Sequence, residues 1–301
     1  MLSDAIIALD GTEAGHRLAM LLALSAALLH AIFGALQKGR YDPWVSRWAI
    51  DLWLLVLSVP LILLVPFPEP HMWPIFAGMV VIHFVYKVMQ AMAYTRGAYT
   101  VVYPVVRGTG PLFTVIGAYL LFGETFTGAQ WIGLAVLLAG IFGLALYNFA
   151  YLETARETLA PALAYAFVTG LFVALYTTYD AYGIRATQDP FTFLAWFFFL
   201  SAFDFPLLMA LPSQRHRLHG VALRPLLKRG LAGAFVAFGS FGCVMLATRL
   251  DKVGEAAVLR ETSTVFAALI GWLALKETVG PRRIALMTLI AVGAVIVELG
   301  G

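Results

Sequence analysis

Apolar runs of about twenty residues, separated by short polar segments, follow one another along almost the whole chain. An α-helix of that length spans a bilayer, because it rises about 1.5 Å per residue and the hydrocarbon core is about 30 Å thick. A membrane β-barrel would show alternating strands of about ten residues instead. The pattern predicts an all-α integral membrane protein with ten transmembrane helices. They are expected at residues 18–37, 48–66, 74–94, 100–122, 128–149, 161–182, 190–211, 230–250, 254–275 and 281–299.

The segment 92–125 is repeated later in the chain. A shift of 153 positions without a gap aligns it with residues 245–278, and ten of the 34 aligned positions are identical. Several identities are polar, which a shared apolar bias does not explain, so we infer a duplication. The first helices of the two copies match more weakly, at an offset of 139. The predicted units are an N-terminal tail (1–17), a first five-helix repeat (18–150), a linker (151–160) and a second five-helix repeat (161–299).

An odd number of helices per repeat has a topological consequence. The second copy must enter the membrane from the opposite face, so the two repeats are expected to be inverted. Inverted repeats related by an axis in the membrane plane are typical of secondary transporters, whose binding site lies near the midplane between the repeats.

Composition agrees with a membrane protein, because 61% of the residues are hydrophobic and only 12% are charged, against about a quarter in soluble proteins. The single cysteine, Cys243, excludes a disulfide framework and a cysteine metal site. We expect no metal, no cofactor and no nucleic acid. The expected partners are a small-molecule substrate and the lipid bilayer, with the chain as a monomer or homodimer. Small residues that predict close helix packing, or a dimer contact, are Gly133, Gly140, Gly143, Ala291 and Gly293.

A family resemblance rests on motifs at the end of each repeat. The first copy carries Pro111, Phe113 and Glu124 with Thr125, followed by Gln130, Gly133 and Gly140. The second carries Glu277, Thr278 and Gly293. This pattern resembles the EamA domain of the drug/metabolite transporter (DMT) superfamily over almost the whole chain. The resemblance implies a ten-helix transporter and leaves the substrate open. Arg107 departs from the aliphatic residue usual at its position; RGTGP (107–111) and RETS (260–263) resemble a sub-branch with some members associated with phosphonate utilisation.

The loops differ in charge between the two sides. Four Lys or Arg residues fall on the side of the N-terminus, and thirteen, Arg47 and Arg229 among them, fall on the other. By the positive-inside rule both termini lie outside the bacterial inner (plasma) membrane. The family resemblance implies the opposite orientation.

One face of the third predicted helix is polar. His83, Lys87, Gln90 and Tyr94 stand at i, i+4, i+7 and i+11, so they share a face that is unfavourable against lipid. We expect this face to line a substrate cavity. The alternative is that Lys87 and Tyr94 extend to the membrane interface. The sixth helix carries Tyr176, a further candidate for substrate contact, at compatible spacing with Asp180.

Three acidic residues within predicted spans are candidates for proton coupling: Glu261 first, then Asp204 and Asp180. Glu261 could instead form a permanent ion pair with Arg107 or Arg260. Asp204 could instead bond a backbone group freed by the nearby proline. Asp51 is expected at the membrane interface.

Arg107 and Arg260 occupy equivalent positions in the two copies, and a threonine follows each two residues later, at Thr109 and Thr262. The two-fold axis that relates inverted copies can bring both arginines to one cavity. Their planar guanidinium groups can each donate two parallel hydrogen bonds to a carboxylate, phosphate or phosphonate. The alternative is that they extend to the interface. With Lys87, three positive charges against one or two carboxylates would favour an organic anion or zwitterion, such as an organic acid, amino acid or phosphonate. Export of amphipathic or cationic metabolites or drugs is the alternative function.

The fourth helix concentrates the helix-breaking residues Pro104, Gly108, Gly110 and Pro111, which predicts a helix bent around the site. An enzyme is not expected, and no catalytic residue is assigned. The sequence holds no HExxH or GxSxG motif and no nucleotide-binding motif, and Tyr179-Asp180 lacks the second carboxylate motif of an intramembrane aspartyl protease.

Overall fold

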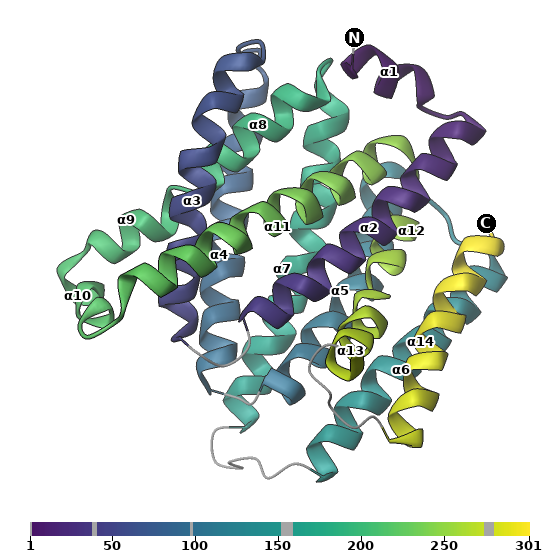
Figure 1. The fold of residues 1–301 in the computed structure, drawn as a ribbon. Helices are drawn as coiled ribbons and strands as arrows, with labels where there is room; N and C mark the ends of the chain where they lie inside the picture. Colours follow the sequence, from purple (N-terminus) through teal and green to yellow (C-terminus); the bar gives the residue numbers. More distant parts are fainter. Residues whose placement is uncertain (1, 38–40, 97–98, 152–158, 274–279) are drawn as a thin grey trace.

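The computed structural model describes residues 2–37, 41–96, 99–151, 159–273 and 280–301, and within these ranges the regular structure is entirely helical (Figure 1). Eight helical segments of the described chain are long and apolar enough to cross a membrane. The helices are α1 (Leu2–Leu9), α2 (Glu13–Gln37), α3 (Pro43–Leu64), α4 (Met72–Arg96), α5 (Tyr99–Phe122), α6 (Gly128–Tyr151), α7 (Leu159–Ala186), α8 (Pro190–Ser201), α9 (Asp204–Ala210), α10 (Pro212–Arg215), the short 3-10 helix η2 (His216–Leu218), α11 (Leu223–Leu250), α12 (Val253–Arg260), α13 (Ser263–Leu273) and α14 (Pro281–Leu299).

Two of the predicted helices are divided. The expected helix at 190–211 separates into α8 and α9, because Pro206 lacks an N–H and its ring conflicts with the carbonyl four residues earlier. The expected helix at 254–275 separates into α12 and α13, where the hydroxyls of Thr262 and Thr264 donate to backbone carbonyls at 2.7 and 2.8 Å. The fourth predicted helix, α5, runs without interruption through Pro104 and Pro111.

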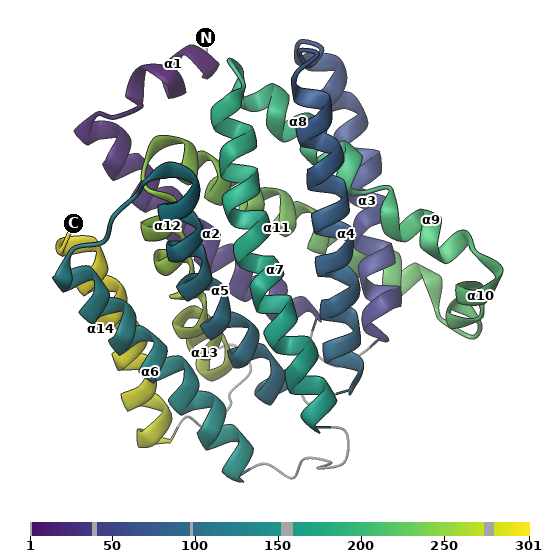
Figure 2. The ribbon, with the colours of Figure 1, turned by 180° about the vertical axis from the view of Figure 1, so that it is seen from behind.

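The second helix of each half begins with the same cap. The Asp42 side chain accepts hydrogen bonds from the backbone N–H groups of Trp44 and Val45, and Pro43 is the first residue of the helix. Asp189, 147 positions later, does the same before α8. An aspartate at the N-cap followed by proline is a strong helix start. The duplication is thus visible in the local structure of α3 and α8, which lie side by side and run in opposite directions (Figures 1 and 2).

Helices of one half pack mainly against helices of the other half. The first helix of each half packs against the third helix of the other: α2 against α11, and α7 against α4. Likewise, α7 packs against α5, and α2 against α12 and α13. The fifth helices, α6 and α14, pack against each other (Figure 2). The polar faces of the first, third and fourth helices therefore meet in the middle of the bundle.

The glycines of α6 and α14 bring these two helices together within one chain. A Cβ atom on Gly293 would lie 2.6 Å from the carbonyl oxygen of Gly133, and one on Gly133 would lie 2.8 Å from that of Gly293. Only glycine permits such an approach of two backbones. The prediction of close packing is confirmed for Gly133 and Gly293, whose contact lies within one chain.

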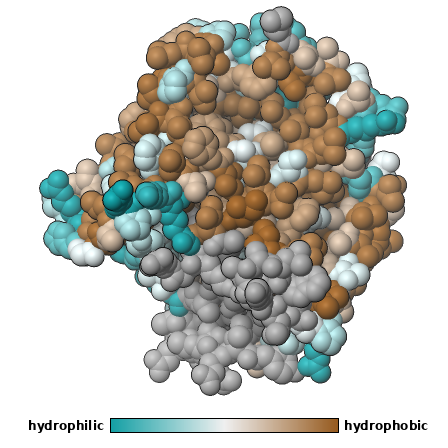
Figure 3. All heavy atoms as spheres, viewed as in Figure 1, coloured by the Kyte–Doolittle hydropathy of each residue, from teal (hydrophilic) through white to brown (hydrophobic). Residues whose placement is uncertain are grey.

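The outer surface is largely apolar. Figure 3 shows a broad hydrophobic face with hydrophilic residues gathered at its borders. Large aliphatic side chains such as Leu64 and Leu120 are 81% and 73% exposed, which suits contact with lipid. Both chain ends lie at the end of the bundle that is poor in Lys and Arg, because Ser3 Oγ donates to Asp189 Oδ1 at 2.7 Å and Thr127 Oγ1 donates to Gly300 O at 2.6 Å.

Candidate substrate and ion-coupling site

Arg107 on α5 reaches the break between α12 and α13. Its Nε lies 2.7 Å from Glu261 Oε2, and its Nη2 donates to Ser263 Oγ at 2.8 Å and to the backbone carbonyl of Arg260 at 3.2 Å. The carbonyl is available because α12 ends at Arg260 and the last carbonyls of a helix have no intrahelical donor. The structure thus brings Arg107, Arg260 and Glu261 together.

Arg260 is much less well compensated than Arg107. It is only 3% exposed, yet the carboxylate of Glu261 is 4.0 Å from its Nε, and its Nη2 contacts Thr177 Oγ1 at 3.5 Å. Within the described part of the chain, Arg260 Nε has no hydrogen-bond acceptor. A buried guanidinium is costly unless it is paired and hydrogen-bonded, so this side chain is suited to receive an oxyanion.

Aromatic side chains surround the two arginines. The guanidinium of Arg107 lies 5.8 Å from the centre of the Tyr103 ring. The charges of Arg107 and Arg260 also act on Tyr86 and on His30 of α2. The site is therefore built by helices of both halves, with two cations, one carboxylate and several aromatic rings.

The two threonines of the repeated pattern have backbone partners. Thr109 Oγ1 donates to Val105 O at 2.8 Å, and the side chain packs on Gly170 of α7, where an added Cβ would lie 2.5 Å away. Thr262 Oγ1 donates to Leu259 O at 2.7 Å. Their hydroxyl hydrogens stabilise helix ends and helix contacts, so neither is available as a donor to a substrate.

Lys87 on α4 belongs to a separate ion cluster. Its Nζ donates to Asp51 Oδ2 on α3 at 2.9 Å, to Asp204 Oδ1 on α9 at 2.9 Å, and to the backbone carbonyl of Ser201 at 2.6 Å. Arg47 joins from α3, with its Nε 3.0 Å from Asp51 Oδ1. The expectation that Lys87 adds an uncompensated positive charge to the substrate site is wrong, because two carboxylates neutralise it.

Asp51 was expected at the interface and is fully buried instead. The physical reason is that α3 begins at Pro43, so Asp51 lies more than two turns inside the helix. Arg47 and Asp51, four residues apart, form the pair that sequence reasoning missed. The signal that could have found it is this spacing of opposite charges within an otherwise apolar run.

His83 pairs with Asp180 one turn before Lys87. The His83 Nε2 to Asp180 Oδ2 distance is 2.8 Å, and both side chains are buried. The His83 ring also lies 4.8 Å, centre to centre, from Tyr176, which in turn lies 4.8 Å from Tyr86. The structure therefore places Tyr176 between this pair and the tyrosine beside the arginines.

The remaining two residues of the polar face lie farther along α4. Gln90 is half-buried and donates to Tyr86 Oη at 2.7 Å. Tyr94, also half-buried, lies within electrostatic reach of Arg107. Both are thus associated with the arginine site rather than with the Lys87 cluster.

The charge-poor end of the bundle is closed by polar contacts. Arg185 Nη1 donates to Glu124 Oε1 at 3.1 Å, while the other carboxylate oxygen of Glu124 accepts from the backbone N–H groups of Val253 and Gly254 at the start of α12. Burial raises the pKa of the Glu124 carboxyl above its usual value, although Arg185 and these N–H groups oppose the shift. Glu277 and Thr278, the equivalents in the second copy, lie outside the described residues.

Three further residues gather at the same end. His16 Nδ1 is 2.5 Å from Asp251 Oδ2, and Glu255 completes a group whose potential metal-ligand atoms lie within 4.8 Å of one another. Glu255 Oε1 already accepts from Gln130 and Lys252 at 2.6 and 2.8 Å. These contacts link α2, α6, α11 and α12 across the end of the bundle.

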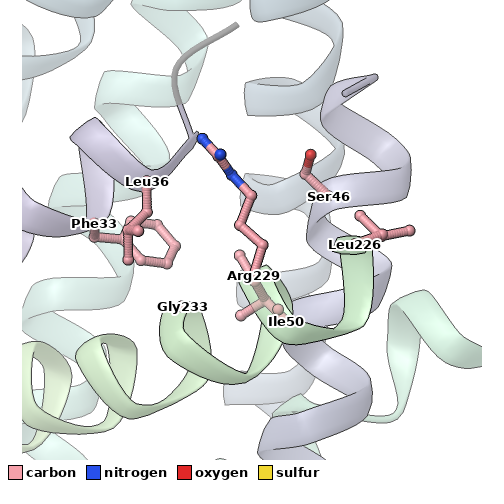
Figure 4. A pocket seen from close by; sticks show the side chains of 8 residues that line it. Phe33, Leu36, Ser46, Ile50, Leu226, Arg229 and Gly233 are labelled. Carbon is pink, nitrogen blue, oxygen red and sulfur yellow. The ribbon is translucent and has the colours of Figure 1, made fainter. Parts of the chain in front are cut away.

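A small pocket opens near the charge-rich end, between α2, α3 and α11. Figure 4 shows Arg229 extending from α11 between Leu36 on α2 and Ser46 on α3. Phe33, also in its wall, lies one turn from His30 along α2. The pocket thus lies toward the end of the bundle opposite the polar contacts.

Sequence comparison places the chain in a family. The model of the EamA-like transporter family matches residues 17–146 and 160–299, one match for each copy of the repeat. The chain belongs to the EamA-like transporter family. This membership makes it a membrane transporter of the DMT superfamily, and the family is one of transporters rather than enzymes.

Two individual proteins are similar to this EamA-like transporter. The uncharacterized protein y4nH of Sinorhizobium fredii (strain NBRC 101917 / NGR234) is 36% identical over 77 residues, which are 26% of this chain and 66% of that protein. A protein of known crystal structure superposes with a TM-score of 0.73 at 19% identity, over 93% of this chain and 98% of its own. The second likeness concerns the fold alone.

Proposed function

We propose that this EamA-like transporter is a secondary active transporter that moves a small organic anion or zwitterion by alternating access around Arg107 and Arg260. The observation that carries the proposal is Arg260, a buried guanidinium with one weak hydroxyl contact and a carboxylate 4.0 Å away. The charges of Arg107, Arg260 and Glu261 sum to +1. A carboxylate, phosphate or phosphonate group would complete the charge balance and satisfy the guanidinium donors.

The proposed architecture is ten spans in two inverted five-helix repeats, residues 18–150 and 161–299 after an N-terminal tail. The number ten is supported if α8 and α9 form one discontinuous span and α12 and α13 form another. The opposite directions of α3 and α8 and the exchanged packing of the halves support an axis in the membrane plane. Discontinuous helices at membrane depth are tolerated where they line a binding site.

Glu261 supplies a mechanism for proton coupling. Without substrate its carboxylate lies against Arg107, and an incoming anion competes for the same guanidinium. A carboxylate displaced from its cation in a low-dielectric interior takes up a proton rather than stay charged. Substrate and proton would then move together. Asp204 and Asp180, which are paired with Lys87 and His83, are the next candidates for the proton site.

The two ends of the bundle support alternating access. Polar contacts such as Arg185–Glu124 close the charge-poor end, while a pocket beside Phe33 opens at the charge-rich end. The positive-inside rule assigns the charge-rich end to the cytoplasm of the bacterial inner membrane and both termini to the outside. In that orientation we propose that the substrate reaches the arginines from the cytoplasmic side when the charge-poor end is closed.

Export of a cationic or amphipathic solute is the second candidate. Four carboxylates within the predicted spans favour it, because the side chains of Asp51, Asp180, Asp204 and Glu261 are at most 6% exposed. The rings of Tyr86 and Tyr176 could also hold a cation over their faces. Each carboxylate has a basic partner within 3 Å, which makes this candidate the weaker one.

Thermal unfolding of the purified transporter distinguishes the two. We expect one class among organic acids, amino acids, phosphate esters and phosphonates to raise the unfolding temperature, because a ligand of the folded state stabilises it. Arg260→Ala should lose the effect, and Arg96→Ala, at an exposed arginine of α4, should keep it. Stabilisation by amines alone would support the second candidate. Uptake into proteoliposomes that ignores an imposed pH gradient would contradict the coupling mechanism.

A further inference from the structure

The break between α8 and α9 forms a compact cage of oxygen atoms around the Lys87 ammonium. Carboxylate oxygens of Asp51 and Asp204 lie 2.9 Å from Nζ, and the carbonyl oxygen of Ser201 lies 2.6 Å from it. The side chains of Lys87, Asp51 and Asp204 are 2%, 0% and 6% exposed. An ammonium has three donors, and each of them has an acceptor here.

This ligand set is the one that alkali cations use at broken membrane helices. Ser201 is the last residue of α8, so its carbonyl belongs to the end of a half-helix, where the backbone dipole is negative. Half-helix ends and unwound carbonyls bind Na⁺ in transporters built from discontinuous helices. Two carboxylates add the charge that a hard monovalent cation requires.

The charges of the cage balance only while Lys87 is present. Arg47 faces Asp51, so two cations stand against two carboxylates. The next titratable pair on α4 and α7, His83 and Asp180, contact each other at 2.8 Å. Removing the Lys87 ammonium would leave one net negative charge in a buried space the size of the missing group.

We infer that the α8–α9 break is a monovalent-cation site in which the Lys87 ammonium takes the place of a metal ion, and that the site binds Na⁺ once the ammonium is removed. In the native transporter Na⁺ is excluded, and the cation held at this break is the protonated lysine. The inference concerns residues distinct from Arg107 and Arg260. It therefore stands or falls independently of the proposed substrate site.

The test compares thermal unfolding of the full chain in NaCl and in choline chloride at equal ionic strength. The native protein should unfold at the same temperature in both salts. Lys87→Ala should unfold at a temperature higher by about 5 °C in NaCl, because only Na⁺ fits the vacated cage. Lys87→Ala with Asp204→Asn, which restores charge balance, should lose the difference. The control is Lys228→Ala, which removes an exposed lysine of α11 and should show no Na⁺ effect.

A folded Lys87→Ala protein with equal unfolding temperatures in the two salts overturns the inference. Lys87→Gln, a neutral donor of similar reach, provides a second variant and should show a smaller shift of the same sign. Recovery of either variant only when Na⁺ is present during extraction supports the site. Failure of both variants to fold in Na⁺ as well as in choline means that Na⁺ does not replace the ammonium, which also overturns it.

Discussion

Arg107 and Arg260 lie 153 positions apart, and the guanidinium of Arg107 donates to the backbone carbonyl of Arg260 across 3.2 Å. The same interval separates the two copies of the repeated stretch, so the contact joins equivalent positions of the two halves. Equivalent residues can meet only near the axis that relates the halves. The two arginines therefore mark the centre of the molecule.

The geometry of the arginines should matter more than their charge. Arg107→Lys and Arg260→Lys keep the positive charge and remove the planar fork that grips an oxyanion through two parallel hydrogen bonds. We expect each variant to weaken substrate binding by roughly tenfold to a hundredfold, the equivalent of losing one charge-assisted hydrogen bond. Titration calorimetry with the substrate found by thermal stabilisation measures the effect. Arg96→Lys is the matched control, and near-native binding by both site variants would remove the arginines from the site.

Glu261 should make anion binding depend on pH. Its carboxylate competes with the substrate for Arg107, so protonation at lower pH releases the guanidinium and tightens binding. If one proton enters with each anion, the dissociation constant rises up to about tenfold per pH unit once Glu261 is ionised. Glu261→Gln should bind with the tight, low-pH affinity at every pH.

The control for this measurement is Glu69→Gln, because Glu69 lies in the loop between α3 and α4 and its side chain is 44% exposed. That variant should keep the native pH profile. An unchanged pH slope in Glu261→Gln would show that another group carries the proton, and Asp204 and Asp180 would be examined next by the same substitution.

The positions of the helices could be predicted from sequence because burial in lipid imposes one simple pattern. Apolar runs long enough to span a bilayer locate α2 to α7 and α14 to within five residues at each end, whereas α11 begins seven residues before the predicted start. The meeting of Arg107 with Arg260 could also be predicted, since the repeat itself contains that information. The two helix breaks could not, because they depend on a local competition between Pro206 or the threonine hydroxyls and the helix hydrogen bonds.

The partners of buried charges were beyond sequence reasoning for a different reason. Lys87 pairs with Asp51, 36 positions away, and with Asp204, 117 positions away. Which carboxylate meets which base depends on the faces that α3, α4 and α9 turn toward one another. No pattern within a single helix carries that information. The polar face of α4 was recognised, but its division between an arginine site and a lysine cluster was not.

The glycine contact between α6 and α14 should govern stability rather than association. Gly293→Val would place a side chain where even a Cβ lies 2.5 Å from Leu137 N and 2.6 Å from Gly133 O. Overpacking of this kind costs roughly 1–3 kcal/mol or more of unfolding free energy. Gly128→Ala is the control, because nothing lies within 4 Å of its added Cβ. Light scattering should give the same oligomeric state for all three proteins; a change of oligomeric state at native stability would support the dimer interpretation.

The distribution of Lys and Arg predicts a membrane orientation that can be tested in intact cells. Arg47 lies inside α3 and contacts Asp51, so it no longer counts as a loop residue, and the asymmetry becomes four against twelve. This still assigns both termini to the outside. Asp4→Cys in a Cys243→Ser background should react with an impermeant maleimide before lysis. Ser213→Cys, at an exposed position of α10 on the charge-rich side, should react only after lysis. The reverse pattern would establish the orientation that the EamA resemblance implies, and the pocket beside Arg229 would then open to the outside.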